Sequence, residues 1–279
     1  MINVSVSAWS VQEKLYTNEI SLIDFFRFCR ENGVKYVELL DCFINGKYSF
    51  KETKDALEKY ELKVSAYSVI NDFVQSNAEE RKKQVEWVMK GIDDACFLGA
   101  RTVRLFTGDP KDGISFDVGK LSIIKCFEDL VKYAGKRGVL LVLENHGVFA
   151  GKSGQIKEIV DAVSSPYLKI NFDTGNFLCV DEEPVDAYMA LRGYVGFVHF
   201  KDYRKVGREE PGYFSLKGLK YNGTVLGKGE IDLKKIAGLL SSDGYNGYFS
   251  IEYESENGGD CLVNTKQSIA YTKELVKAL

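Results

Sequence analysis

Residues 139–144 read Val-Leu-Leu-Val-Leu-Glu, and residues 168–173 read Leu-Lys-Ile-Asn-Phe-Asp. Each is a short, mainly apolar segment that ends in a carboxylate. Segments of this length and composition are typical of buried strands. Between them, residues 155–163 show the apolar spacing of a helix. The two segments therefore predict a strand-helix-strand unit.

The same alternation of strand-length and helical segments continues along the whole chain. Helices are expected to include residues 22–31, 79–98, 122–137 and 155–163. Gly33, Gly99 and Gly138 lie just before predicted strands, where the end of a helix favours glycine. The predicted strands are residues 2–8, 36–40, 64–70, 102–106, 139–144, 168–173, 195–200 and 248–253. Eight such strands predict an α/β fold, a closed (β/α)8 TIM barrel.

Composition limits the classes of protein to which the chain can belong. With 45% hydrophobic and 28% charged residues it resembles ordinary globular proteins. The net charge of −3, from 37 basic and 40 acidic residues, gives no basic surplus for nucleic acid. The chain has no run of about 20 apolar residues and no signal-like start, so we expect no membrane contact and a cytoplasmic location. Six cysteines are scattered singly, which predicts reduced thiols.

No linker composition divides the chain, and only four prolines occur in it. A single domain over residues 1–279 is therefore expected. One long stretch, residues 203–229, reads as irregular and is rich in Lys, Arg, Gly and Tyr. Connections this long in a compact domain are usually lids, binding loops or interfaces.

Four predicted strands carry an ionisable residue at their carboxyl end. The carboxyl ends of barrel strands meet at one face, so these side chains are expected to share a pocket. A carboxylate at a strand end is often only a helix cap or an ion-pair partner, but four strands that repeat the pattern favour one common site. The residues are Glu144, Asp173, His199 and Glu252.

Three carboxylates in a partly dry pocket repel one another unless a cation compensates them. A set rich in oxygen, with one imidazole, suits Mn²⁺, Mg²⁺ or Co²⁺ somewhat better than a structural zinc, although the ligand types do not exclude Zn²⁺. The sequence therefore predicts one divalent metal ion, with Mn²⁺ as the first choice.

Residues two apart on a strand point to the same side, which adds candidates to the pocket. His146 follows Glu144 in this way, and Lys201 follows His199. Both are candidates for binding substrate. The alternatives are an ion pair between Lys201 and Glu254, and a hydrogen bond from His146 that only orients a ligand.

At these residues the chain closely resembles the xylose isomerase-like TIM-barrel superfamily, in particular its sugar phosphate isomerase/epimerase branch. The resemblance covers nearly the whole length. The motifs that carry it are LENHG (residues 143–147), FDTGN (172–176), HFKD (199–202), GKGEID (227–232) and IEYE (251–254).

The resemblance implies a metal held by Glu144, Asp173, His199 and Glu252. In the ketose 3-epimerase-like members the two glutamates also serve as acid and base, so Glu144 and Glu252 are the predicted catalytic pair. The expected activity is that of a sugar isomerase or epimerase in carbohydrate metabolism, which removes a proton next to a carbonyl and passes through an enediolate. Asn176 is expected to bind the substrate or to cap the following helix.

Another branch of the superfamily, the apurinic-site endonucleases with three zinc ions, has histidines that this chain lacks. Asn176 replaces the His of their Asp-x-x-His motif, and Thr107 stands where they have a His after the fourth strand. The chain has only two histidines in total. These differences argue against phosphodiester hydrolysis and favour a single metal.

Other activities of the same fold stay open. A dehydratase resembling inosose dehydratase, or a lyase of 3-keto-glycosides, begins with the same proton abstraction. A barrel that has lost catalysis and serves as a binding subunit is a third alternative. We expect a small sugar as the partner, and a homo-oligomer is compatible with the sequence. Whether the sugar is phosphorylated is not determined, because basic residues of the long stretch either reach a phosphate or face solvent (Lys205, Arg208, Lys217, Lys220).

Overall fold

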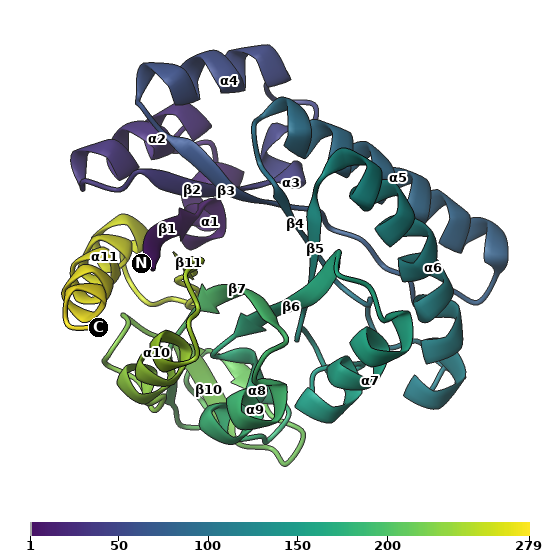
Figure 1. Cartoon of the computed structure of the whole chain (residues 1–279). Coiled ribbons are helices and arrows are strands. Elements are labelled where there is room, and N and C mark those ends of the chain that lie inside the picture. The colour runs from purple at the N-terminus through teal and green to yellow at the C-terminus, as the bar shows by residue number, and fades with distance from the viewer. Residues whose placement is uncertain (1) are drawn as a thin grey trace.

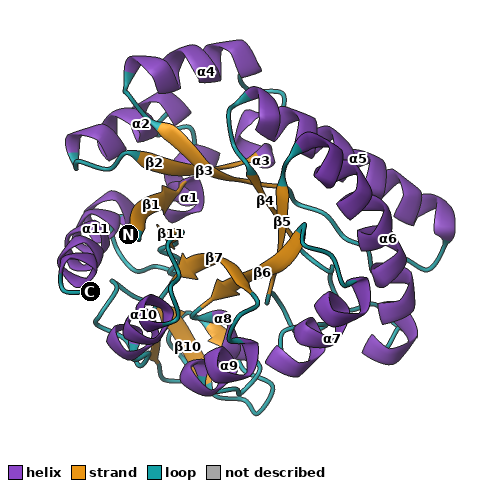
Figure 2. Ribbon diagram, viewed as in Figure 1, coloured by secondary structure: helices purple, strands orange, loops and turns teal. Residues whose placement is uncertain are grey.

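The computed structural model describes residues 2–279, and eight parallel strands close into a barrel in the order β1-β11-β7-β6-β5-β4-β3-β2. Figure 2 shows these strands as an inner ring with the helices outside it. Each predicted strand segment overlaps one of them, which confirms the (β/α)8 barrel. The strands are β1 (Asn3–Ser7), β2 (Tyr36–Leu40), β3 (Lys63–Ser68), β4 (Thr102–Leu105), β5 (Leu140–Glu144), β6 (Leu168–Asp173), β7 (Val195–Phe200) and β11 (Tyr248–Ile251).

The helices that cover the barrel begin and end at the signals expected for them (Figure 1). Ser21 and Ser49 each form a capping box with an acidic residue three positions on. Gly138 ends its helix in the left-handed conformation, with φ of 63°. The longer helices are α2 (Leu22–Glu31), α4 (Phe50–Lys59), α5 (Ala78–Phe97), α6 (Phe116–Arg137), α7 (Ser153–Val163), α9 (Pro184–Leu191), α10 (Leu233–Ser242) and α11 (Cys261–Lys277).

Shorter helices lie in the connections that follow the strands. Two of them come directly after strands that carry site residues, because the chain turns sharply there. These short elements are η1 (Ala8–Val11), α1 (Gln12–Tyr16), α3 (Asp41–Ile44) and α8 (Asn176–Cys179).

The barrel interior changes from apolar to charged along its axis. Ala66, Val142 and Phe197 form an apolar cluster inside the barrel. Two positions further along their strands, Ser68, Glu144 and His199 are buried polar residues. Because alternate residues of a strand point to the same side, the charged layer lies directly above the apolar one, toward the carboxyl ends of the strands.

Residues 203–229 are not irregular throughout, which corrects the expectation, although loops still make up most of this stretch. They form a three-stranded antiparallel sheet in the order β8-β10-β9. Its strands are too short, and too often interrupted by glycine, to show alternation in the sequence. They are β8 (Tyr203–Lys205), β9 (Tyr213–Phe214) and β10 (Lys220–Gly223).

A single carboxylate joins the start of this small sheet to its end. Asp202 Oδ2 accepts hydrogen bonds from the backbone N–H groups of Gly227 and Gly229, and its Oδ1 accepts one from that of Ile231. A Cβ at Gly229 would lie 2.1 Å from Asp202 Oδ1 and 2.4 Å from the carbonyl oxygen of Tyr203. The motifs HFKD and GKGEID therefore meet in space, and glycine is required at their contact.

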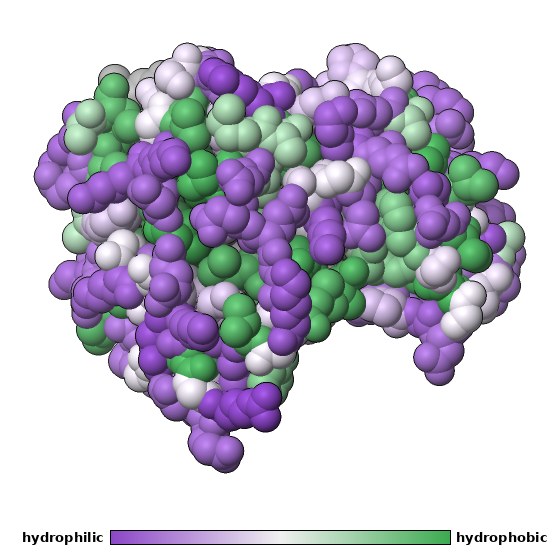
Figure 3. All heavy atoms as spheres, turned by 90° about the horizontal axis from the view of Figure 1, so that it is seen from below, coloured by the Kyte–Doolittle hydropathy of each residue, from purple (hydrophilic) through white to green (hydrophobic). Residues whose placement is uncertain are grey.

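Within residues 2–279, no helix is both long and apolar enough to cross a membrane. The six cysteines are free, as expected. Figure 3 shows a face covered mainly by hydrophilic side chains, with hydrophobic ones gathered around a hollow at its lower edge.

Candidate metal centre and substrate pocket

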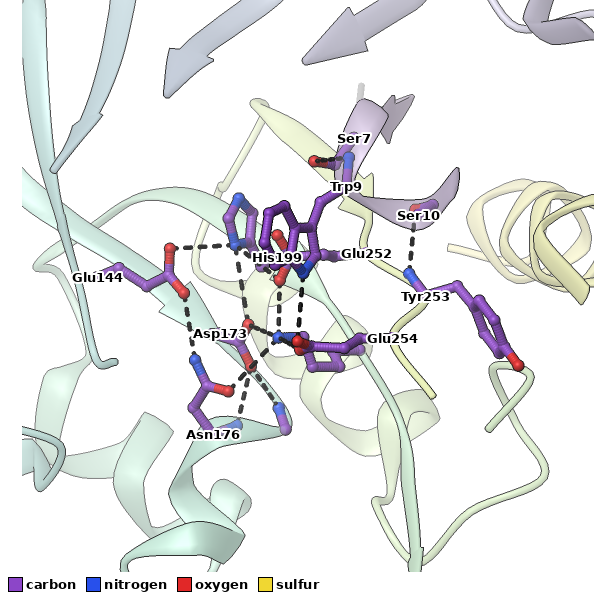
Figure 4. A network of polar contacts seen from close by, with 12 residues as sticks. Ser7, Trp9, Ser10, Glu144, Asp173, Asn176, His199, Glu252, Tyr253 and Glu254 are labelled. Carbon is purple, nitrogen blue, oxygen red and sulfur yellow. Dashed lines mark hydrogen bonds and ion pairs between the residues drawn. The ribbon is translucent and has the colours of Figure 1, made fainter. Parts of the chain in front are cut away.

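The four predicted metal ligands meet at the carboxyl ends of their strands. Each offers one oxygen or nitrogen atom, and these four atoms all lie within 4.8 Å of one another. Around His199 Nδ1, Glu144 Oε2 lies at 3.3 Å, Glu252 Oε2 at 3.4 Å and Asp173 Oδ2 at 3.7 Å. Figure 4 shows Glu144 and Glu252 on either side of His199. The structure thus brings together all four residues.

The unsatisfied atoms of this cluster fit a divalent cation. All four residues are buried. In the described part of the chain, Asp173 Oδ2 and His199 Nδ1 are buried and make no hydrogen bond, although Lys201 Nζ lies 3.1 Å from Asp173 Oδ2 as an ion-pair partner. A buried donor or acceptor without a partner costs about 1–3 kcal/mol. A cation between three carboxylates and one imidazole would satisfy these atoms and reduce the repulsion among the carboxylates.

His199 is held from its other side by Glu38, a residue that the sequence analysis missed. His199 Nε2 lies 2.9 Å from Glu38 Oε1, and the hydroxyls of Ser68 and Ser250 donate to the same carboxylate. This contact leaves Nδ1 facing the ligand cluster. A signal was present, because Glu38 interrupts the apolar segment YVELL at a position where alternation directs it into the barrel.

Charges in this cluster shift the pKa values of its members. Burial alone would lower the pKa of His199, but the carboxylates of Glu252, Glu38 and Glu144 raise it well above its usual value. Burial opposes ionisation of Glu144, yet the charges of His199 and Arg104 outweigh it and lower its pKa to about 2. For Glu252, burial is likewise outweighed by His199 and Lys201, and its pKa is well below its usual value. Both glutamates are therefore ionised at neutral pH.

Lys201 lies among three carboxylates. Its Nζ is 2.7 Å from Glu252 Oε2, 3.0 Å from Glu254 Oε2 and 3.1 Å from Asp173 Oδ2. The ion pair with Glu254, which was the alternative to a role in binding, is therefore present. Lys201 also lines the pocket, so its position is compatible with both roles.

Asn176 is the first residue of α8 and belongs to the same network. Its Nδ2 donates to Glu144 Oε1 at 3.2 Å, and its Oδ1 accepts from Lys201 Nζ at 3.5 Å. Its side chain therefore links two predicted site residues and does not cap the helix.

The remaining residues of two motifs position the strands. Asn145 of LENHG exchanges two hydrogen bonds with the backbone of Asp173. Thr174 of FDTGN does the same with the backbone of Lys201. A Cβ at Gly175 would lie 2.9 Å from the Lys201 side chain, so glycine leaves room for it. Hydrogen bonds from these motifs therefore connect the ends of β5, β6 and β7 beside the cluster.

A cavity of about 460 Å³ opens above the ligand cluster. His146 is exposed on its wall, with its ring 4.3 Å from that of Phe106. None of the four basic residues named as phosphate candidates lines it. The lining residues are Trp9, Leu40, Ile70, Asn71, Asp72, Gln84, Arg104, Phe106, Gly108, Asp109, Glu144, His146, Lys201, Glu252 and Glu254.

Arg104, on β4, is the second residue of the site that was missed. It is only 3% exposed and lines the cavity. Its Nε lies 3.2 Å from Glu144 Oε2, and its guanidinium carbon lies 3.9 Å from the centre of the Phe106 ring. As with Glu38, a charged residue inside an apolar strand segment, here TVRLF, indicated an inward side chain.

A sequence model of the xylose isomerase-like TIM barrel matches residues 26–277. The chain belongs to this family. The match confirms the resemblance carried by the five motifs. The positions of the four clustered residues are consistent with membership in this family, because each residue comes from the carboxyl end of a barrel strand.

Among curated members of the family, the chain is similar to inosose dehydratases. It is 29% identical to that of Bacillus thuringiensis (strain Al Hakam) over 134 residues, which are 46% of this chain and 44% of the relative. The matched region thus spans less than half the length of the curated relative.

Solved structures resemble nearly the whole chain. The IOLI protein with a binding zinc atom has a TM-score of 0.80 at 17% identity, and the match covers 99% of both chains. L-ribulose 3-epimerase has a TM-score of 0.75 at 16% identity, covering 100% of this chain and 95% of the other. At these identities the likeness establishes a shared fold.

Proposed function

We propose that this chain is a divalent-metal-dependent sugar isomerase or epimerase, which acts on a keto-sugar or polyol by removing a proton next to a carbonyl. The observation that carries the proposal is the position of Glu144 and Glu252 on either side of His199, with one oxygen of each within 3.4 Å of Nδ1. Two ionised carboxylates on opposite sides of one pocket can remove a proton from one face and return it to the other.

Glu144, Asp173, His199 and Glu252 would hold one divalent ion, for which Mn²⁺ is our first choice among Mn²⁺, Mg²⁺, Co²⁺ and Zn²⁺. When bound, the ion supplies positive charge next to the carbonyl and makes the neighbouring C–H more acidic. The zinc atom of the IOLI protein supports a metal on this fold.

In the proposed reaction Glu144 or Glu252 takes the proton at the carbon next to the carbonyl, and an enediolate forms on the substrate. The other glutamate takes up a proton from solvent and delivers it to the opposite face, which gives the epimer, whereas delivery of the abstracted proton to the neighbouring carbon gives the isomer. His146, Asn176 and Lys201 would bind substrate oxygens, because each lies at the cavity or contacts a ligand residue. The similarity to L-ribulose 3-epimerase supports this chemistry.

Dehydration is the second candidate, favoured by the similarity to inosose dehydratases. It shares the first step and differs in the second, because the enediolate expels a neighbouring hydroxyl as water. Lys201, which lines the cavity, is then a candidate to supply a proton to the leaving oxygen.

Solvent exchange tests the step that both candidates share. An active metal-loaded enzyme, given a ketohexose or an inosose in D₂O, should introduce deuterium at the carbon next to the carbonyl. Glu144→Gln and Glu252→Gln keep the size and one oxygen but remove the base, so each should lower the rate at least about a hundredfold. Glu86→Gln, at a 63% exposed side chain, is the matched control.

If the wild-type enzyme converts substrate without solvent exchange, a proton that is shielded from solvent also explains the result. In that case the glutamine variants decide whether the two glutamates act as acid and base. Wild-type rates in both variants, with the metal still bound, would exclude the two glutamates as acid and base. The product of the same reaction in H₂O separates the candidates, since an epimer or isomer keeps the mass of the substrate and dehydration lowers it by one water.

A further inference from the structure

The ammonium group of Lys201 contacts oxygens that are expected to bind the metal ion. Its Nζ lies 2.7 Å from Glu252 Oε2 and 3.1 Å from Asp173 Oδ2. The same two oxygens face His199 Nδ1, at 3.4 and 3.7 Å. The Lys201 side chain is only 3% exposed, so water and salt screen its charge little. A divalent ion bound to these oxygens would therefore be repelled by the ammonium group beside it.

Glu254 is a third carboxylate partner of Lys201, and it does not belong to the ligand cluster. Its Oε2 lies 3.0 Å from Lys201 Nζ. On another side of the ammonium group, the neutral Oδ1 of Asn176 accepts a hydrogen bond at 3.5 Å. Glu254 can therefore keep the charge of Lys201 paired without using an oxygen that the ion requires.

Three other side chains fix the carboxylate of Glu254. The indole Nε1 of Trp9, from η1, donates to its Oε1 at 3.2 Å (Figure 4). The hydroxyl of Tyr213, from β9, donates to Oε1 at 3.4 Å, and that of Tyr203, from β8, donates to Oε2 at 3.5 Å. Because these donors come from three separate elements, the carboxylate is a fixed partner toward which the long Lys201 side chain can move.

We propose that Lys201 takes the place of the divalent ion beside Glu252 and Asp173 in the metal-free protein, and that Glu254 is the positioning residue that draws the ammonium group away when the ion binds. The proposal rests on the metal centre of the proposed function and not on its reaction. In the metal-free protein the ammonium group reduces the repulsion among the carboxylates. When the ion binds, Glu254 prevents the charge of Lys201 from being left buried and unpaired.

A double-mutant cycle on metal affinity, measured by titration calorimetry with Mn²⁺ and Zn²⁺, tests the proposal without a substrate. Lys201→Met removes the competing charge and should bind the ion at least about tenfold more tightly. Glu254→Gln leaves the ammonium group only the ligand carboxylates as charged partners, and should bind the ion about 10- to 100-fold more weakly. Because Glu254 acts through Lys201, Glu254→Gln should change the affinity less than about threefold once Lys201→Met is present.

The cycle separates positioning by Glu254 from simple attraction between its charge and the ion. Simple attraction persists without Lys201, so it would give Glu254→Gln the same loss of affinity in both backgrounds. That result would overturn the proposal, and so would an unchanged or lower affinity of Lys201→Met. The exposed pair Lys82 and Glu86 on α5 gives the matched control, since these side chains are 68% and 63% exposed. Lys82→Met, Glu86→Gln and their double variant should bind the ion as wild type does.

Melting temperatures give a second measurement. Lys201→Met should melt lower than wild type in chelator, and added metal should raise its melting temperature more than that of wild type. An equal rise in both proteins would overturn the proposal. Lys201→Gln keeps a donor to the carboxylates and repeats both measurements if Lys201→Met does not fold.

The outcomes also distinguish this proposal from the proposed function. Wild-type protein that binds none of Mn²⁺, Mg²⁺, Co²⁺ and Zn²⁺ would refute the metal centre and this proposal together. Metal binding without coupling between Lys201 and Glu254 would refute this proposal alone. The deuterium exchange experiment tests the reaction separately, because it depends on Glu144 and Glu252 as bases.

Discussion

Glu38 and His199, which come from β2 and β7, are joined inside the barrel by contacts of 2.9 and 3.0 Å between the imidazole Nε2 and the two carboxylate oxygens. The carboxylate accepts a hydrogen bond from Nε2–H and thereby leaves Nδ1 facing the cluster. A carboxylate behind a metal-binding histidine orients the ring and raises its basicity.

Glu38→Gln should therefore weaken metal binding. Glutamine keeps the size and an acceptor but loses the charge, so we expect about tenfold lower affinity, within the roughly 10- to 100-fold range for such partners. Titration calorimetry with Mn²⁺ and Zn²⁺ measures it, and Glu86→Gln serves as the surface control. An affinity equal to that of the control would show that the contact has no influence on the cluster.

Loss of a metal ligand should weaken metal binding more than loss of Glu38, which only orients a ligand. Asp173→Ala and His199→Ala should each lower the metal affinity more than about a hundredfold. A bound ion stabilises only the folded state, so a chelator should lower the melting temperature of wild-type protein by roughly 5 °C. Both variants should melt at the same temperature with and without chelator. A clear chelator effect in both would place the ion elsewhere.

Metal binding should depend on pH with a defined sign. The neighbouring carboxylates raise the pKa of His199 well above its usual value, so the metal-free protein carries its proton at neutral pH. An ion that binds Nδ1 must displace that proton, and the affinity should rise about tenfold per pH unit below this pKa. Calorimetry in buffers of different ionisation enthalpy should report about one proton released per ion. Release of none would mean that His199 is not a ligand.

Gly229→Ala tests the closure of the small sheet. The added Cβ would lie 2.1 Å from Asp202 Oδ1, and we expect a loss of about 1–3 kcal/mol in the free energy of unfolding. The control is Gly238→Ala in α10, where a Cβ would meet no atom of the described chain within 4 Å. Since alanine is the better helix former, that variant should gain about 0.5–1 kcal/mol. Equal denaturant midpoints for the two variants would contradict the close contact.

The sequence predicted the parts of this protein that follow from periodicity. All eight barrel strands and the cluster of Glu144, Asp173, His199 and Glu252 could be placed, because the carboxyl ends of barrel strands share one face. Glu38 and Arg104 were missed, because the prediction used charged residues at strand ends and both of these residues lie in the middle of an apolar segment. Alternation alone would have directed both inward.

The sequence did not predict which ionised side chains from distant parts of the chain form ion pairs. The three partners of Lys201 come from the end of β6 and from the residues just after β11, and their distances depend on how the barrel closes. The short strands of residues 203–229 also escaped notice, because a two-residue strand such as β9 carries no period. The contact of Asp202 with the end of that segment, which helps to organise it, is likewise not visible in the sequence.

That contact has an evolutionary consequence. The segment begins just after Asp202, and the backbone N–H of Gly229 at its other end donates to the Asp202 carboxylate. Its two ends are therefore held together independently of the residues between them. Replacement or lengthening of the intervening residues need not move β7, which precedes the segment and carries His199. The intervening residues can therefore vary in length and sequence, while the strands that carry the four clustered residues keep their positions.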